Sequence, residues 1–336
     1  MTTTLWRSGW RTGIARSTIV LLATSLGSGT LVAGAASAQS YPSKPITLVV
    51  PFPAGGPNDA IARVAAQLMA SRLQQNVIID NRVGAGGTVG LRAVARAEPD
   101  GYTLLLGSLS SLAIAPAFYA NAGYDPVTSF APIAMVSEEP QALAVRPGLP
   151  VRSVADLVAY AKASPGTLNF GGTIGTLSHL TGELFKSVTG ADIVYVPYKG
   201  GAQALTDVLG GQTEMIFLSA SALTGLVHDG KLRALAVTGA TRIAELPDAP
   251  TMIESGYPHV LVNFWTGILA PAGTPPEIIA RLAAAISDGL KLSNANTTIS
   301  KLAPKQSIPP QAFASFIADE VQKWAAIVKS SGAKID

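Results

Sequence analysis

The sequence contains no cysteine among its 336 residues. A chain without cysteine can form no disulfide, offer no thiol nucleophile and bind no metal through thiolates. Its three histidines, His179, His228 and His259, are scattered and form no HxxxH-type pair, so we expect neither a metal site nor a cofactor. Such a chain must be stabilised by its hydrophobic core, which this length is sufficient to build.

Charged residues are also scarce, at 13 % of the chain, whereas hydrophobic residues make up 48 %. This composition is typical of a folded chain with large cores, and the length is enough for two domains. No basic run interleaved with aromatic residues occurs in the sequence. Such a run is the usual mark of a nucleic-acid-binding surface, so we expect no nucleic acid as a partner.

Residues 1–38 are predicted to be a cleavable signal peptide. Three arginines, at positions 7, 11 and 16, precede a stretch of apolar and small residues, and the Ala-Ser-Ala at 36–38 fits the rule for cleavage. A single membrane anchor is the alternative, which the interrupting Ser, Gly and Thr residues disfavour. The chain has 24 basic and 21 acidic residues, so removal of three arginines leaves 21 of each and a formal charge of zero.

Short apolar runs alternate with helical patterns in the first third of the mature chain. Strands are expected at 46–50, 76–80 and 102–107, and helices at 58–74 and 90–97 between them. This β-α-β-α-β order predicts an α/β fold with a parallel sheet covered on both faces.

The same alternation returns later in the chain, which predicts a second α/β unit. We place domain 1 at residues 41–143 plus 264–336 and domain 2 at residues 144–263, although no Gly/Ser linker separates them. The further strands are expected at 142–145, 167–171, 192–196, 213–217, 232–237 and 264–270, and a surface helix at 275–290.

The chain leaves its first predicted strand through "PFPAGGPND", residues 51–59. A helix N-terminus presents free N–H groups and a partial positive charge, so it can bind an anion without any Lys or Arg. Gly55 and Gly56 would let the backbone approach a ligand. Asn58 and Asp59 are equally compatible with ordinary helix caps and with a role in organising a ligand site.

Residues 51–59 connect a predicted strand to a predicted helix, and we call such a connection a corner. Three further corners follow predicted strands: "GSLSS" at 107–111, "GGTIGTLSH" at 171–179 and "YKGGAQ" at 198–203. Open α/β sheets bind ligands at the carboxyl ends of their strands, where these corners lie. Hydroxyls and backbone amides suit a carboxylate, whereas turn and cap chemistry explains any single Ser or Thr. Lys199 could neutralise an anion or be a solvated turn residue.

Enzyme and nucleotide motifs are missing. "GAGGTVG" at 84–90 has Val89 where a GxGxxG fingerprint needs its third glycine, and no Gly-Lys-Ser/Thr follows a glycine-rich loop. The sequence also lacks the GxSxG of α/β hydrolases. We therefore expect no enzymatic activity, with a secreted α/β hydrolase as the disfavoured alternative, and we interpret residues 84–90 as a loop that shapes the ligand site.

Several motifs together resemble one receptor family, in order and at matching separations. They are "YPSKPITLVVPFPAGGPND", "NRVGAGG", "PDGYTLLLGS", "VPYKGGAQALTDVLGGQTEM", "GKLRALAVT", "LPDAPT" and "GILAPAGTPPEIIARL". From about Tyr41 to its end, the chain resembles the substrate-binding receptors of tripartite tricarboxylate transporters, the Bug family.

This resemblance implies a type II periplasmic-binding-protein-like fold, with two α/β domains joined by crossover strands and a ligand cleft between them. It implies a periplasmic receptor for a small carboxylate: a di- or tricarboxylate, an acidic amino acid or an aromatic acid. The implied partners are the large and small membrane subunits of a tripartite transporter. A sensor kinase of a two-component system is the alternative partner.

By motif, the resemblance also implies ligand-binding residues in three corners. Pro57 and Asn58 stand where the family commonly has Gly and Thr or Ser, at positions that would set ligand identity. The implied residues are Phe52, Ala54, Gly55, Asn58 and Asp59 in the first corner, Ser108 and Ser110 in the second, and Thr173, Gly175, Thr176 and Ser178 in the third.

Overall fold

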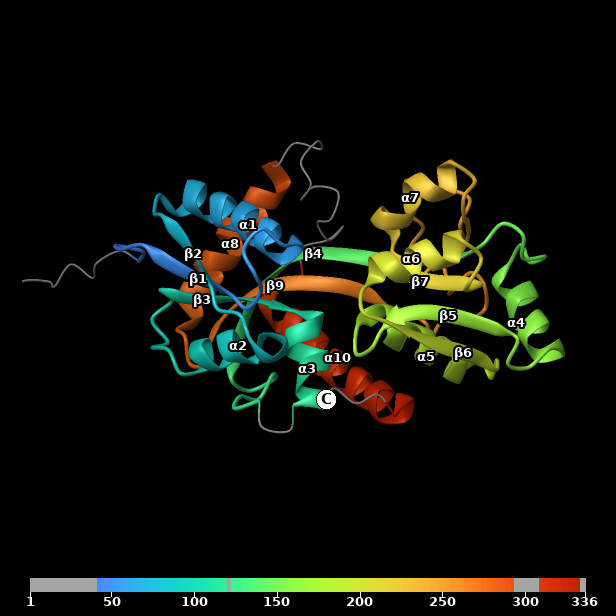
Figure 1. Ribbon diagram of the computed structural model, residues 1–336. Coiled ribbons are helices and arrows are strands. Elements are labelled where there is room, and N and C mark those ends of the chain that lie inside the picture. Colours follow the sequence, from blue (N-terminus) through green and yellow to red (C-terminus); the bar gives the residue numbers. More distant parts are fainter. Residues whose placement is uncertain (1–40, 120–121, 293–307, 333–336) are drawn as a thin grey trace, which may run out of the picture. The chain divides into compact units, whose positions relative to one another are not determined.

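The computed structural model describes residues 41–119, 122–292 and 308–332 (Figure 1). The predicted signal peptide lies outside these residues. Within the described ranges, no helix combines the length and the apolar character needed to cross a bilayer. The chain has the predicted α/β fold, with helices on both faces of a mixed sheet.

The first group of strands confirms the predicted alternation. Each of its three strands lies within one residue of the expected bounds, and β1 pairs in parallel with both β2 and β3. The elements are β1 (Ile46–Val50), α1 (Pro57–Leu73), β2 (Val77–Asn81), η1 (Ala85–Gly87), α2 (Thr88–Ala95) and β3 (Thr103–Ser108).

The remaining elements repeat the α/β order and then return to the first group. They are η2 (Leu109–Ile114), α3 (Ala115–Phe118), β4 (Phe130–Val145), α4 (Val154–Ala163), β5 (Leu168–Thr173), α5 (Leu177–Thr189), β6 (Ile193–Tyr198), α6 (Gly201–Leu209), β7 (Met215–Ser219), α7 (Ala220–His228), β8 (Arg233–Val237), β9 (Asn263–Pro271), α8 (Pro276–Leu292) and α10 (Pro310–Ser331).

The parallel pairing predicted for the first three strands is confirmed, but the sheet as a whole is mixed. The strand order is β2-β1-β3-β9-β4-β7-β5-β6, with β8 also paired to β4, and β4 and β9 run antiparallel to their neighbours. Parallel neighbours need a crossover connection, usually a helix. Strand β9 enters from residues 238–262, which contain no helix, and it pairs antiparallel with both β3 and β4.

Strand β4 is much longer than the predicted segment 142–145, since it begins at Phe130. Its first part pairs with β9 and its last part with β7 and β8, so it belongs to both groups of strands. The sequence signal was hidden because Glu138, Glu139 and Pro140 interrupt the apolar run in the middle of the strand.

Helices bury both faces of each group of strands. Leu48 and Val50 pack towards α1 and α8, whereas Val49 joins the core beneath α2, η2 and α10. Figure 1 shows α1 and α8 on one side of the first group and α10 on the other. Strands covered on both faces are apolar without interruption, which explains why "ITLVV" was recognisable from sequence.

A buried carboxylate fastens α10 to β9. Glu320, which is 7 % exposed, accepts hydrogen bonds through Oε2 from the indole N–H groups of Trp265 (3.1 Å) and Trp324 (3.0 Å). Its Oε1 accepts a hydrogen bond from Nζ of Lys323, which also donates to the carbonyl of Leu261. Both indole rings are fully buried, so no solvent can replace this acceptor.

We expect Glu320→Leu to lower the free energy of unfolding by about 3 kcal/mol, because it leaves two buried indole donors without acceptors. Urea unfolding followed by circular dichroism measures this loss. The side chain of the exposed neighbour Asp319 forms no hydrogen bond or ion pair with the described residues, so Asp319→Leu is the control and should change stability by less than about 0.5 kcal/mol. Equal effects of the two substitutions would contradict the role of Glu320.

Candidate ligand-binding site

The strand registers bring two sets of carboxyl ends to one stretch of β4. Ser108 ends β3 level with Thr266, which pairs with Ser137 of β4, and Ser219 ends β7 opposite Gln141. Because β3 runs in the direction of β4 and β7 runs against it, the two ends point towards each other. They are separated along β4 by residues 137–141, about 13 Å at the rise of a strand. We call residues 137–141 the crossing segment.

The corner between β1 and α1 is organised by Asp59, which is 1 % exposed. Its Oδ2 accepts hydrogen bonds from the N–H of Gly55 (2.9 Å) and Nε of Arg63 (2.7 Å), and its Oδ1 accepts one from Nδ2 of Asn81 (3.0 Å). Gly55 has φ of +79°, a conformation that favours glycine. The carboxylate therefore holds the loop in place, and its charge is balanced within the corner.

These contacts set the acidity of Asp59. Burial alone would raise its pKa, but the hydrogen bonds from Arg63, Gly55 and Asn81 outweigh burial and lower the pKa to about 2. A group whose pKa is lower in the folded chain stabilises the fold above its unfolded pKa. This stabilisation is lost as the pH falls from about 4 to about 2.

We therefore expect Asp59→Asn to lower the free energy of unfolding at neutral pH by at most about 2 kcal/mol. Arg63 is half-exposed, so solvent screening makes the loss smaller than this limit. Urea midpoints measured from neutral pH down to about pH 2 should fall less steeply for this variant than for the native chain. Asp248→Asn, at an exposed loop position, is the control and should follow the native profile. Identical profiles for all three proteins would contradict the assignment.

The other predicted residues of this corner differ in burial and in hydrogen bonding. Phe52 is partly buried and its carbonyl accepts a hydrogen bond from Asn81, whereas Ala54 is exposed. Oδ1 of Asn58 is buried without a hydrogen-bond partner. The N-cap of α1, Gly56, supplies no side-chain acceptor to the first turn of the helix.

In the corner after β3, Ser108 and Ser111 cap each other. The N–H of Ser108 donates to Oγ of Ser111 (3.1 Å), and the N–H of Ser111 donates to Oγ of Ser108 (3.3 Å). Ser110 is partly exposed. The glycine loop packs here, because a Cβ on Gly87 would lie 3.0 Å from Cβ of Ser111 and 3.3 Å from Cβ of Pro51. The loop at 84–90 thus packs against this corner.

In the corner between β5 and α5, the hydroxyls that the sequence singled out divide into two kinds. Thr176 donates to the carbonyl of Thr173 (2.6 Å), and Ser178 donates to the carbonyl of Phe217 (2.5 Å). Oγ1 of Thr173, in contrast, is buried without a partner. The first turn of α5 has no side-chain cap, so its N–H groups remain available to an anion.

His179 and Gly175 stabilise the same corner. Gly175 has φ of +73°, and its N–H donates to Nδ1 of His179 (3.2 Å). The imidazole stacks on the ring of Tyr195 at 4.0 Å. Burial lowers the pKa of His179, which keeps the ring neutral and Nδ1 free to accept this hydrogen bond. The histidine is therefore a structural element of the corner.

Unsatisfied polar atoms gather around these corners. Among the described residues, eight buried side-chain polar atoms have no hydrogen-bond partner, and four of them lie in the corners or on strands β4 and β9. Buried polar groups are normally hydrogen-bonded, so these four atoms are candidate contacts for a ligand or for water. The four atoms are Oδ1 of Asn58, Oε1 of Gln141, Oγ1 of Thr173 and Oδ1 of Asn263.

Gln141 and Asn263 were missed by the sequence analysis. Gln141 is only 4 % exposed, and it directly precedes the apolar segment 142–145. A buried amide at the edge of an apolar strand was the available signal, but nothing in the sequence showed which other strands meet it.

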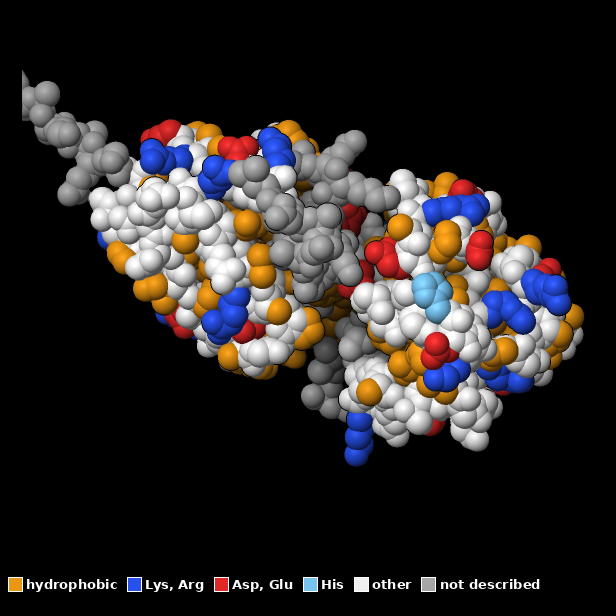
Figure 2. Space-filling view, turned by 90° about the horizontal axis from the view of Figure 1, so that it is seen from above, with side chains coloured by type: hydrophobic (Ala, Val, Ile, Leu, Met, Phe, Trp, Pro, Cys, Tyr) orange, Lys and Arg blue, Asp and Glu red, His pale blue; other side chains and the backbone are white. Residues whose placement is uncertain are grey.

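Positive charge contributes little to the corners. Arg63 is bonded to Asp59, and Lys199, before α6, is exposed. Figure 2 shows Lys and Arg side chains scattered over the visible face rather than gathered in one patch. In the part of the chain that the structure describes, no group of three or more His, Asp or Glu side chains could hold a metal ion.

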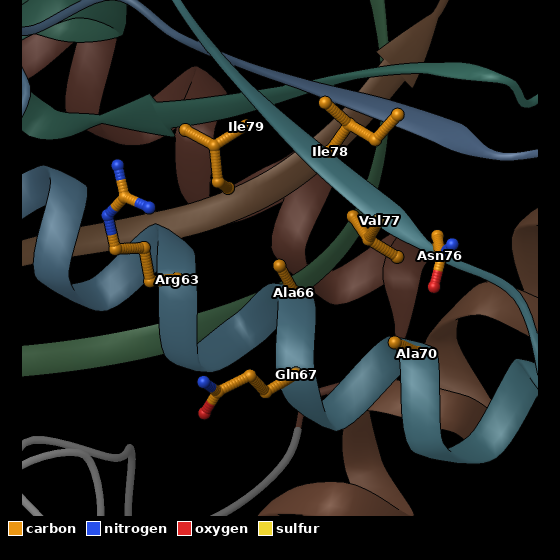
Figure 3. Close-up of a pocket in the computed structure, with 8 residues that line it drawn as sticks. All are labelled: Arg63, Ala66, Gln67, Ala70, Asn76, Val77, Ile78 and Ile79. Atoms are coloured by element: carbon orange, nitrogen blue, oxygen red, sulfur yellow. The ribbon is translucent and has the colours of Figure 1, made fainter.

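A separate hollow lies between α1 and the edge strand β2 (Figure 3). It contains none of the predicted site residues, and its lining is largely apolar. The lining residues are Arg63, Ala66, Gln67, Ala70, Asn76, Val77, Ile78 and Ile79.

Comparison with known proteins identifies one family. Residues 61–333 match the family described as "Tripartite tricarboxylate transporter family receptor". Among curated proteins, the protein BugT of Bordetella pertussis is 38 % identical over 310 residues, which cover 90 % of this chain and 94 % of BugT.

Two solved structures resemble most of the chain. "MatC (Rpa3494) from Rhodopseudomonas palustris with bound malate" is 32 % identical with a TM-score of 0.65, and it covers 86 % of this chain and 100 % of its own. "R. palustris Rpa4515 with adipate" is 35 % identical with a TM-score of 0.69, with coverages of 88 % and 100 %.

Proposed function

Because the chain belongs to the tripartite tricarboxylate transporter receptor family, whose members are periplasmic solute receptors and not a class of enzymes, we propose that it captures a small organic carboxylate and delivers it to the large and small membrane subunits of such a transporter. Export directed by a cleavable signal peptide at residues 1–38 is part of this proposal. Uptake of radiolabelled ligand by cells with and without the chain tests the delivery step.

The uncapped N-terminus of α5 is the observation that carries the proposal. Strand β5 ends at Thr173, whose buried hydroxyl has no partner, and α5 begins at Leu177. A carboxylate accepts hydrogen bonds through both oxygens and is further stabilised by the positive end of the helix. The bound malate and adipate of the two related structures are both small carboxylates, which supports this ligand class.

We further propose that residues 41–143 plus 264–336 and residues 144–263 act as two domains that close on the ligand. Strand β4 supports this division, since its pairing changes from β9 to β7 and β8 near Gln141. In such a receptor the ligand favours the closed state because closure adds contacts that the open state lacks.

Isothermal titration calorimetry with mono-, di- and tricarboxylates tests capture directly. We expect at least one carboxylate to bind, and Thr173→Val to weaken its binding by about tenfold, which corresponds to one lost hydrogen bond. Thr206→Val is the matched control, because that exposed hydroxyl donates only to the carbonyl of Ala202 within α6. If no carboxylate in the panel bound, the proposed function would be wrong.

Lys199 distinguishes backbone binding from binding by a cation. We expect Lys199→Met to change the affinity by less than about threefold, since an exposed charge is screened by solvent. The same titrations at low and moderate ionic strength check this expectation. A loss of tenfold or more at low salt would show that a lysine, rather than the helix N-termini, provides the main contact.

A further inference from the structure

A tight turn at residues 173–176 connects β5 to α5. The N–H of Thr176 donates to the carbonyl of Thr173 (3.1 Å), which closes the turn. Its third residue, Gly175, has φ of +73°, whereas Ile174 is not among the residues with positive φ. This combination defines a type II turn. The peptide between Ile174 and Gly175 therefore has its N–H on one side of the turn and its carbonyl on the other.

The side chain of His179 fixes the orientation of this peptide. The N–H of Gly175 donates to Nδ1 of His179 (3.2 Å). An imidazole nitrogen accepts a hydrogen bond only when it carries no proton, so this contact requires a neutral ring with its proton on Nε2. The ring stacks on Tyr195, whose hydroxyl donates to the carbonyl of Gly172 (3.0 Å). A Cβ on Gly172 would lie 3.1 Å from the backbone N of His179, so the packing on this side is close.

The charges around His179 nearly cancel. Burial lowers the pKa of His179, Glu183 raises it and Lys186 lowers it, and these two side chains form an ion pair with each other (2.9 Å). The strands that pack against α5, which are β5, β6 and β7, contain no Asp, Glu, Lys or Arg. No charged residue of α10, which shares a hydrophobic core with α5, contributes to the pKa shift. A carboxylate bound at this corner would therefore be the main electrostatic influence on the ring.

Protonation of Nδ1 would turn this hydrogen bond into a contact between two donors. Rotation of the central peptide relieves the contact, because it converts the type II turn into a type I turn, with changes of about 150–170° in ψ of Ile174 and φ of Gly175. Glycine adopts either sign of φ, and the Ile174 side chain is 47 % exposed, so no packed core opposes the rotation. The carbonyl of Ile174 then accepts a hydrogen bond from Nδ1, and the N–H of Gly175 points out of the turn.

We propose that His179 is a positioning residue that couples carboxylate capture to the uptake of a proton from solvent, with the bound ligand favouring the protonated ring and the rotated peptide. This inference rests on the proposed function, because the ligand is held at the first turn of α5. His179 is the third residue of α5, so its positive charge would lie in the same turn as the N–H groups that bind the carboxylate. By linkage, protonation strengthens ligand binding by the same factor by which the ligand favours protonation.

Calorimetric titration at pH 8, 7 and 6 tests this coupling with the carboxylate that binds best in the panel. We expect the dissociation constant to fall by at least about threefold from pH 8 to pH 6. Titrations in two buffers of different ionisation enthalpy should show that about half a proton is taken up per bound ligand at pH 6. Protonation of the ligand's own carboxyl groups has the opposite effect on affinity, since it removes the charge that α5 would hold.

The substitution His179→Asn separates the acceptor from the proton. Asparagine can place an acceptor oxygen where Nδ1 lies, but it cannot be protonated. We expect the ratio of the dissociation constants at pH 8 and pH 6 to fall to about one in this variant. His228→Asn, at the exposed end of α7, is the matched control and should keep the native ratio.

A second measurement needs no substitution in the binding corner. Nitrogen NMR of the histidine rings reports which ring nitrogen carries a proton, and the His179 signals are assigned by their absence from the asparagine variant or, should that variant fail to fold, by elimination with His228→Asn and His259→Asn. We expect an unprotonated Nδ1 in the free chain at neutral pH and a higher pKa of His179 when the ligand is bound.

The outcomes separate this inference from the proposed function. If the native affinity does not rise towards pH 6, if His179→Asn keeps the native ratio, or if the ligand leaves the pKa of His179 unchanged, the inference is wrong while carboxylate capture stands. If no carboxylate binds at any pH, both are wrong. A rise in affinity that disappears with asparagine supports the inference.

Discussion

The pairing of one long strand with two groups of neighbours is the constraint on which the candidate site depends. β4 is hydrogen-bonded to β9 along its first part and to β7 and β8 along its last part. Since β3 ends near one end of residues 137–141 and β7 near the other, both sets of strand ends are directed at the same stretch. A shift in either register would flip side chains to the opposite face and separate the polar groups that now meet there.

The helix N-termini around this stretch differ in whether a carboxylate of the chain accepts a hydrogen bond from a nearby backbone N–H. In the β1–α1 corner the carboxylate of Asp59 binds the loop N–H of Gly55, and at α7 the carboxylate of Glu139 binds Ser221. The first turn of α5 has no such internal acceptor. The first turns of both α1 and α5 therefore keep N–H groups without a side-chain cap, which an anion from outside could bind.

Much of the fold follows from local patterns. Strands such as "ITLVV" are apolar on both faces because helices cover both sides, and the glycine-rich exits mark where each strand ends. The predicted corners were also found where expected, since a strand that ends before a helix needs a turn. The antiparallel β4 and β9 were not foreseen as such, because their direction depends on connections far apart in the chain.

The sequence alone therefore determined most of the elements and the corners, because hydrophobic period and turn chemistry are local properties. Only the tertiary structure decided which hydroxyls are occupied: Ser178 donates to Phe217, 39 residues away, while Thr173 keeps its hydroxyl unpaired. It likewise decided that the side-chain oxygens Oε1 of Gln141 and Oδ1 of Asn263 are buried without a hydrogen-bond partner. Hydrogen-bond partners on distant strands are set by register and long-range pairing, and a single sequence carries no local signal for either.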